Sequence, residues 1–139
     1  MQFLIPLVLS LIAYAGLQPS LSVLESPNCP KYTQGYVKDE QVFICPNELT
    51  LPRQEVINHE VVHLVQSNLG VDTLLPGQVI NFLALHTLEE KDQLSVILYY
   101  SDSGYVSSEY EARILQKLHP RIIMSLLRFS QDYATLTNS

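Results

Sequence analysis

The sequence predicts a small α+β domain in which a short antiparallel sheet packs on one central helix and the C-terminal half is helical. Two short runs of β-branched and aromatic residues flank a polar turn before position 46, and from position 52 onward apolar residues recur at helical spacing. With 139 residues, 47% of them hydrophobic, the chain can fill a single core. We therefore expect one folded domain over residues 31–139.

The chain before this domain divides into two parts. Residues 1–17 contain no charged side chain, and Ala13-Tyr14-Ala15 resembles the small-x-small site at which signal peptides are cleaved. We predict a leader, either a signal peptide of a secreted or periplasmic protein or an uncleaved apolar segment that contacts a membrane or a larger assembly. Residues 18–30 are rich in Ser and Pro and predict a linker.

The predicted hairpin consists of strands at residues 32–37 and 41–45, joined by the polar turn at 38–40. The only two cysteines, Cys29 and Cys45, flank this hairpin. An even pair suits an exported protein with one disulfide, whereas two unpaired buried thiols are the alternative in a cytosolic protein.

The clearest helix lies between Pro52, which suits a first helical turn, and Gly70, which suits a C-terminal cap. Its apolar face, at i, i+4, i+7 and i+8, consists of Ile57, Val61, Leu64 and Val65. A second, polar stripe consists of Glu55, His59, His63 and Gln66. One side of this helix is therefore expected to pack in the core, and another side carries the polar residues that could take part in a functional site.

The rest of the chain predicts helices at residues 78–87, 91–101, 108–118 and 122–133. The first is expected to bury a face made of Val79, Phe82, Leu83 and His86. The second also has strand propensity, and we favour a helix because Leu94, Ile97 and Leu98 have helical spacing. The last is expected to bury Ile123, Leu126 and Leu127.

His59-Glu60-Val61-Val62-His63 is an HExxH sequence on the predicted central helix. The two imidazoles lie one turn apart and about 40° apart around the axis, so both can reach one ion. Glu60 is offset by about 100° and can instead reach a water in the fourth position of zinc. The pattern predicts peptide hydrolysis, with zinc as Lewis acid and Glu60 as general base. The competing interpretation is a helix that carries two unrelated His residues.

A third protein ligand is required because two His residues alone hold zinc poorly. The sequence does not continue as HExxHxxGxxH, since Gln66 and Leu69 stand at the Gly and His positions. The remaining candidates are Glu89, Glu90, Glu109, Glu111, His86 and His119. Ser108 and Glu111 fit a capping box, which gives Glu111 a structural role. Glu109 and Glu111 lie about 200° apart on a helix, so only one of them can face the metal.

The segment Ser107-Ser108-Glu109-Tyr110-Glu111-Ala112-Arg113 resembles the ExEA(D/N) segment of the Glu-ligand zincins, or gluzincins. It is similar to the segment in the CAAX-prenyl-protease type of zinc peptidase and in ImmA/IrrE-like peptidases. The resemblance covers HEVVH, Gln66 and EYEA. It implies a zincin-like fold, with Glu109 as the third ligand on a helix packed against the HExxH helix. Arg113 stands where the pattern has Asp or Asn to support a ligand His, which leaves that supporting group unassigned.

The resemblance also implies that a peptide or protein substrate adds as a strand beside an edge strand, here residues 41–45. Tyr105, Tyr110 and His119 are candidate donors to the oxyanion that develops on the substrate carbonyl. Gln66 is expected to hydrogen-bond a strand or the substrate. Nucleic acid is not an expected partner, because the net charge is −6 and no Lys/Arg cluster exists.

These observations favour a zinc metalloendopeptidase. The second hypothesis is a catalytically silent zincin-like protein with a structural or interaction role in a larger assembly. Arg113 and the small size favour that alternative, whereas Glu60 argues against it because a structural metal site needs no base. A small disulfide-stapled toxin or inhibitor is disfavoured because two cysteines are few and the core is ample.

Overall fold

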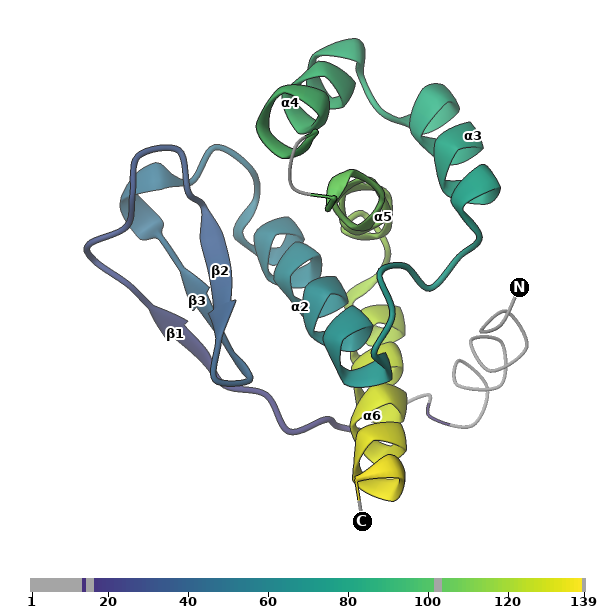
Figure 1. The fold of residues 1–139 in the computed structure, drawn as a ribbon. Coiled ribbons are helices and arrows are strands. Elements are labelled where there is room, and N and C mark those ends of the chain that lie inside the picture. The colour runs from purple at the N-terminus through teal and green to yellow at the C-terminus, as the bar shows by residue number, and fades with distance from the viewer. Residues whose placement is uncertain (1–13, 15–16, 102–103, 139) are drawn as a thin grey trace.

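The computed structural model of the protein describes Tyr14, residues 17–101 and residues 104–138. Apart from Tyr14 and Leu17, the predicted leader at 1–17 lies outside the described residues. A small sheet stands on one side of a central helix, and further helices surround the other sides (Figure 1). In the described ranges, no helix combines the length and the apolar character needed to cross a membrane.

The three-stranded sheet has the order β1-β3-β2, with β1 at Val23–Glu25, β2 at Gly35–Lys38 and β3 at Gln41–Ile44. The pair β2–β3 is the predicted antiparallel hairpin, with Gly35 opposite Ile44. Its turn residues Asp39 and Glu40 both have positive φ values, 52° and 61°. Positive φ at both central positions is the requirement of a type I′ turn, whose twist matches that of the two strands.

β1 corrects three predictions. It falls in residues 18–30, which were predicted to be a linker, and it pairs with β3 in parallel, so the sheet is mixed rather than antiparallel. It also makes β3 the central strand, so the edge expected at residues 41–45 is wrong. The hydrogen bonds of this short segment come from β3, including Val42 N–H to Ser22 O at 3.0 Å. A strand of three residues made by distant partners leaves no local pattern in the sequence.

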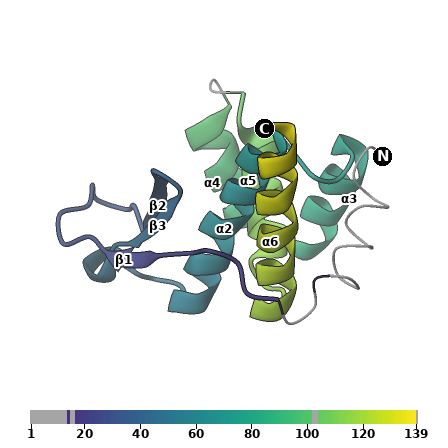
Figure 2. The same cartoon turned by 90° about the horizontal axis from the view of Figure 1, so that it is seen from below.

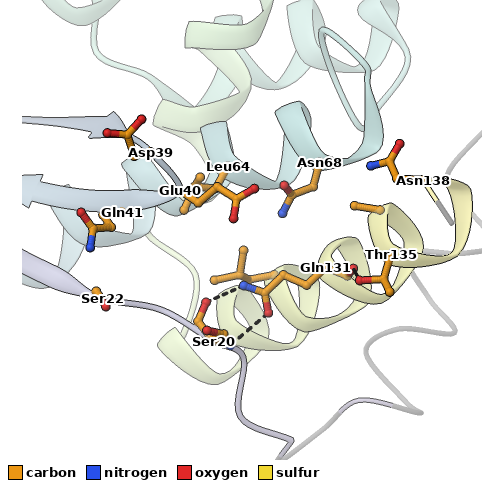
Figure 3. A pocket seen from close by; sticks show the side chains of 12 residues that line it. Ser20, Ser22, Asp39, Glu40, Gln41, Leu64, Asn68, Gln131, Thr135 and Asn138 are labelled. Atoms are coloured by element: carbon orange, nitrogen blue, oxygen red, sulfur yellow. Dashed lines mark hydrogen bonds between the residues drawn. The ribbon is translucent and has the colours of Figure 1, made fainter.

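The segment before β1 is held by the last helix, α6 (Pro120–Thr137). The side-chain amide of Gln131 donates to the carbonyl of Ser20 and accepts from its N–H, as Figure 3 shows. Arg128 donates to the carbonyl of Gln18 at 2.9 Å. These residues are therefore part of the folded domain.

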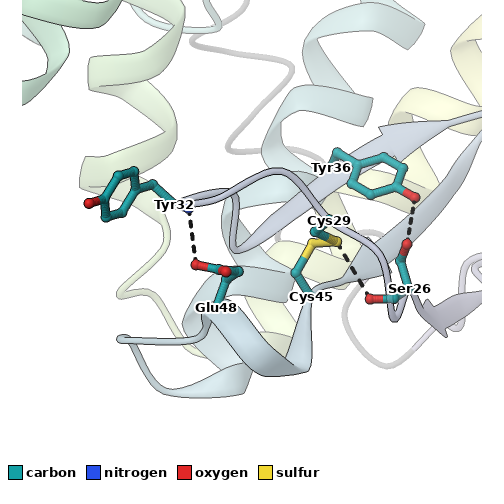
Figure 4. Close-up of a disulfide and its surroundings, with 6 residues drawn as sticks. All are labelled: Ser26, Cys29, Tyr32, Tyr36, Cys45 and Glu48. Carbon is teal, nitrogen blue, oxygen red and sulfur yellow. Dashed lines mark hydrogen bonds between the residues drawn. A yellow bond between two sulfur atoms is a disulfide. The ribbon is translucent and has the colours of Figure 1, made fainter.

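Cys29 and Cys45 form a disulfide, with their Cα atoms 5.9 Å apart (Figure 4). It joins the loop before β2 to the end of β3. The same loop is held at Tyr32, whose N–H donates to Glu48 of the 3-10 helix η1 (Pro46–Glu48) at 3.0 Å. Gln34 adds two bonds, since its side-chain oxygen accepts from two backbone N–H groups just before the central helix.

Replacing both cysteines by Ser is expected to lower the free energy of unfolding by about 3 kcal/mol, because the disulfide restricts the unfolded chain. Urea unfolding of the wild type and of C29S/C45S measures the difference. Wild-type protein unfolded with a reductant should match the variant. Equal stabilities of oxidised wild type and variant would contradict this prediction.

The central helix α2, Arg53–Leu69, has the predicted ends. Gly70 follows it with a φ of 67°, and its N–H donates to Ser67 O at 3.1 Å. Glycine adopts this left-handed conformation without strain, so it closes the helix. The predicted apolar face is buried, and it consists of Ile57, Val61, Leu64 and Val65. The core cluster of this face also includes Val42, Ile44, Ile123, Leu126 and Leu127.

The remaining helices follow the predicted order with shifted ends: α3 is Gly77–Thr87, α4 is Glu90–Tyr100 and α5 is Val106–Leu115. Both α5 and α6 pack on α2, and the predicted residues Ile123, Leu126 and Leu127 of α6 are buried. α3 and α4 pack against α5 (Figures 1 and 2). The arrangement is a mixed α+β fold in which α2 lies between the sheet, α5 and α6.

α3 and α4 are helices as predicted, but they bury other residues. On α3 the buried side chains are Ile80 and Ala84, whereas Phe82 of the predicted face is 60% exposed. On α4 the predicted residues Leu94, Ile97 and Leu98 are exposed, and Val96 is buried. α3 is apolar around much of its circumference, so periodicity cannot decide which side contacts α5.

Candidate metal centre

α2 and α5 bring together the side chains of His59, His63 and Glu109. The Nε2 atoms of His59 and His63 are 3.2 Å apart. Glu109 Oε1 lies 2.7 Å from Nε2 of His63 and 3.4 Å from Nε2 of His59. Tetrahedral zinc with bonds of about 2.0–2.1 Å has its ligand atoms about 3.3 Å apart. The cluster therefore fits one zinc ion after a small opening of the His63–Glu109 pair.

Burial and hydrogen bonding set the charges of this cluster. Burial disfavours the charged imidazole of His63, but the hydrogen bonds to Glu109 and Gln66 and the charges of Glu109 and Glu60 together outweigh burial and raise the pKa of His63 to about 8. Burial also disfavours the Glu109 carboxylate, yet its hydrogen bonds with His59 and His63 and the charges of these imidazoles together hold the pKa of Glu109 well below the usual range. Glu109 is thus ionised at neutral pH, as a metal ligand must be, and an ion displaces a proton from His63.

Two glutamine side chains orient the imidazoles. Oε1 of Gln116 lies 2.8 Å from Nδ1 of His59, and Oε1 of Gln66 lies 2.9 Å from Nδ1 of His63. Because an amide oxygen only accepts, each Nδ1–H donates and each Nε2 is left for the ion. Gln116 therefore orients the ring of His59, a role for which the resemblance left no residue assigned because Arg113 stands at the supporting position. The side chain of Gln66 hydrogen-bonds His63, Ser108 and Glu111, none of which lies in a strand. The other expectation for Gln66, a hydrogen bond to the substrate, stays a prediction.

Replacing Gln116 by Ala is expected to weaken zinc binding about 10- to 100-fold, because His59 loses the group that fixes its ring. Competition with a chromophoric chelator measures the dissociation constant. Gln93→Ala is the matched control, since the side chain of Gln93 on α4 donates to Leu88 O, just after α3, and not to either histidine. Equal zinc affinities for wild type and Gln116→Ala would remove Gln116 from the centre.

Glu111 faces away from the cluster, as expected if only one of the two carboxylates can face a metal. It accepts hydrogen bonds from Leu74 N–H at 2.7 Å, Leu75 N–H at 2.8 Å and Gln66 Nε2 at 3.1 Å. Burial raises the pKa of Glu111, and these three hydrogen bonds oppose the shift. Glu111 anchors the chain that leaves α2, which is a structural role.

The predicted capping box at Ser108 and Glu111 is wrong. α5 begins at Val106, so Ser108 lies inside the first turn and its hydroxyl donates to Tyr105 O at 3.0 Å. Among the described residues, the only group of three or more converging His, Cys, Asp and Glu side chains contains Glu109. The candidates that do not join it are Glu89, Glu90, Glu111, His86 and His119. His119 instead caps α6, where its Nδ1 accepts from the backbone N–H at position 121.

Glu60 lies beside the cluster in a pocket of about 200 Å³. Gly35 lines this pocket from β2, Tyr100 from α4, and Arg113 from α5. Burial raises the pKa of Glu60, the imidazoles of the cluster oppose the shift, and the Glu109 carboxylate adds to it. A carboxyl group whose pKa is shifted toward neutrality is suited to accept and return a proton.

None of the predicted oxyanion donors lines this pocket. Tyr105 is 60% exposed, Tyr110 is buried with its hydroxyl donating to a backbone carbonyl of α4, and His119 caps α6. Tyr100, which sequence reasoning missed, lines the pocket instead. Burial and the Glu109 carboxylate raise the pKa of Tyr100, so its hydroxyl stays protonated and can donate.

A larger cavity of about 590 Å³ lies between the hairpin turn, α2 and α6 (Figure 3). Its lining includes Asp39, Glu40, Asn68 and Gln131, and neither histidine of the cluster. Within the described ranges, no converging group of metal-binding side chains lies there. The chemistry that the sequence predicts is therefore concentrated at the smaller pocket.

Comparison with known proteins found no relative. No protein-family model matches this chain, and neither a curated protein nor a solved structure matches it. The roles of His59, Glu60, His63 and Glu109 accordingly rest on their own geometry and chemistry, and they stay predictions.

Proposed function

We propose that the protein is a zinc-dependent endopeptidase with His59, His63 and Glu109 as ligands and Glu60 as general base. The observation that carries the proposal is the convergence of three ligand atoms within 4.8 Å of one another. Glu60 adds to it, because it lines the adjoining pocket and is not part of the converging group. A metal site that only stabilised the fold would have no use for a carboxylate in that position.

Held by His59, His63 and Glu109, zinc would supply a Lewis acid and would lower the pKa of a bound water. Glu60 accepts the proton of the water that attacks the peptide carbonyl carbon. It then delivers this proton to the leaving nitrogen as the C–N bond breaks. Tyr100 lines the pocket, and its hydroxyl is a donor suited to stabilise the negative carbonyl oxygen.

β2 offers the substrate an edge strand, because in the described sheet it pairs only with β3. Cys45 N–H donates to Gln34 O at 2.8 Å, so alternate residues from Gln34 onward bond to β3. The N–H and C=O groups of Gly35 and Val37 therefore point to the open edge. A peptide can add there as a strand, and Gly35 would place it beside Glu60.

Replacing Gly35 by Ala is expected to destabilise the protein by about 1–3 kcal/mol and to impair substrate binding. A Cβ atom at this position would lie 2.9 Å from Val56 Cγ1 on α2 and 3.0 Å from Phe43 O on β3, so the backbone of β2 or these neighbours must shift. Urea unfolding and the KM for a peptide substrate measure the two effects. Gly77→Ala is the control, because its Cβ meets nothing within 4 Å. Similar results for the two variants would contradict the close approach.

The proposal is tested by incubating the zinc-loaded protein with a peptide library and identifying cleaved bonds by mass spectrometry. We expect cleavage that stops when a chelator removes the metal and resumes when zinc is restored. Stoichiometric zinc without cleavage of any peptide would instead favour the catalytically silent zincin-like protein.

We also propose that the protein acts in an oxidising compartment, as a secreted or periplasmic protein. The disulfide between Cys29 and Cys45 supports this location, because such bonds persist outside the reducing cytosol. The membrane-tethered alternative depends on residues 1–17. Fractionation of expressing cells, followed by mass spectrometry of the N-terminus, distinguishes the two.

A further inference from the structure

Arg113 is the only Lys or Arg side chain, among the described residues, that lines the pocket beside Glu60. A guanidinium has five N–H donors. Nε of Arg113 is buried and has no hydrogen-bond partner in the described structure. Nε lies 3.8 Å from Oε2 of Glu109, and Nη1 lies 3.6 Å from Oδ1 of Asp92, and both distances are too long for hydrogen bonds. The pocket therefore contains a cation whose donors are available to a ligand.

Arg128 provides a comparison, because its guanidinium forms hydrogen bonds in this structure. Arg128 on α6 donates to the carbonyl of Gln18 at 2.9 Å and to Asp132 at 3.3 Å. Arg113, like Arg128, has a carboxylate four residues away on its own helix, yet it makes only the longer contacts. A helix-surface ion pair alone thus does not account for the position of Arg113.

Zinc binding would further weaken the interaction of Arg113 with Glu109. Glu109 would then direct its charge to the ion, and Asp92, whose side chain is 38% exposed, would be the remaining partner. In that state the formal charges of zinc and Arg113 cancel those of Glu60, Glu109 and Asp92. Without Arg113 this group of charges, which includes Asp92 beside the pocket, would be net negative and would disfavour an anionic ligand.

We propose that Arg113 binds a carboxylate of the substrate close to the scissile bond, so that acidic peptides are preferred. This inference rests on the proposed function and specifies its substrate class. The planar guanidinium suits a carboxylate because it can form two parallel hydrogen bonds with it. The carboxylate can belong to an acidic side chain or to a free C-terminus.

The test measures binding rather than turnover. Zinc-loaded Glu60→Gln protein, which keeps peptides intact, is titrated with N-acetylated alanine-rich hexapeptides that carry one Glu or one Gln at each position in turn. A second set compares a free C-terminal acid with its amide. We expect the carboxylate member of at least one pair to bind about 10- to 100-fold more tightly, as for a hydrogen bond to a charged group.

The preference should disappear when Arg113→Gln is added and persist when Arg128→Gln is added. A Glu-over-Gln preference identifies a side-chain carboxylate, and an acid-over-amide preference identifies the C-terminus. Equal binding within every pair, or a preference that survives Arg113→Gln, would overturn the inference. Zinc content and thermal melting of each variant verify folding. If the Arg113→Gln variant does not fold, Arg113→Lys takes its place in the test. Lys keeps the charge but not the planar guanidinium, so this variant should reduce the preference.

Failure of this inference and failure of the proposed function give different results. A carboxylate preference that depends on Arg113, without cleavage of any peptide by the wild type, would retain the anion site and reject the peptidase. Cleavage without any preference for peptides that carry a carboxylate would retain the peptidase function and reject this role of Arg113.

Discussion

Glu60→Gln is expected to lower kcat/KM for peptide cleavage by about 10²- to 10⁴-fold, the usual contribution of a general base. Gln has nearly the same shape as Glu but cannot take the proton from water. Zinc content should not change, because Glu60 is not part of the converging ligand group. Burial raises the pKa of Glu60, so this side chain is shielded from solvent. Removing its carboxylate should therefore affect the reaction.

Cleavage of a quenched fluorescent peptide measures this loss, and the metal content of the same samples is determined in parallel. Glu25→Gln on β1 is the matched control, since it removes one carboxylate outside the pocket lining. A Glu60→Gln protein that keeps wild-type turnover would show that Glu60 is not the base. Loss of zinc together with activity would make Glu60 part of the metal site instead.

Glu109→Ala is expected to weaken zinc binding by more than the roughly 100-fold that loss of a supporting group causes. The substitution leaves only the two imidazoles, and two His residues hold zinc poorly. Chelator competition measures the dissociation constant, and peptide cleavage should fall with zinc occupancy. Unchanged zinc affinity in this variant would exclude Glu109 as a ligand.

Glu111→Ala, two residues away, should have the opposite pattern. It leaves the N–H groups of Leu74 and Leu75 and the amide of Gln66 without their acceptor. The free energy of unfolding should fall by about 2–4 kcal/mol, because each unsatisfied buried donor is costly. The folded fraction should still bind zinc. If Glu111→Ala lost zinc and Glu109→Ala kept it, the assignment of the third ligand would be reversed.

The central helix could be predicted from sequence because each of its signals is local. Pro52 and Gly70 mark its ends, and the spacing from Ile57 to Val65 marks its buried face. The geometry of a helix then places His59 and His63 on one side, whatever the rest of the chain does. Helix geometry alone could not select Glu109 as the third residue of the cluster. That prediction came from the resemblance of residues 107–113 to the gluzincin segment.

The features that could not be predicted depend on distant partners. β1 exists because β3 hydrogen-bonds to it, and the role of Glu111 depends on a loop that lies 36 residues away in sequence at Leu75. One residue that the sequence analysis missed, Gln116, does follow a helical pattern. Gln116 follows Glu109 by seven positions, about two turns, so both lie on the same side of α5. Its role still required knowing that α5 packs on α2.

The central claim is that His59, His63 and Glu109 hold one zinc ion. Its most direct test is the metal content of the purified, dialysed wild-type protein by inductively coupled plasma mass spectrometry, beside His63→Ala. The account predicts about one zinc per wild-type chain and almost none in the variant, since a zinc site requires at least three protein ligands. A wild-type protein without zinc, even after incubation with zinc salt, would contradict it and make HEVVH a coincidence.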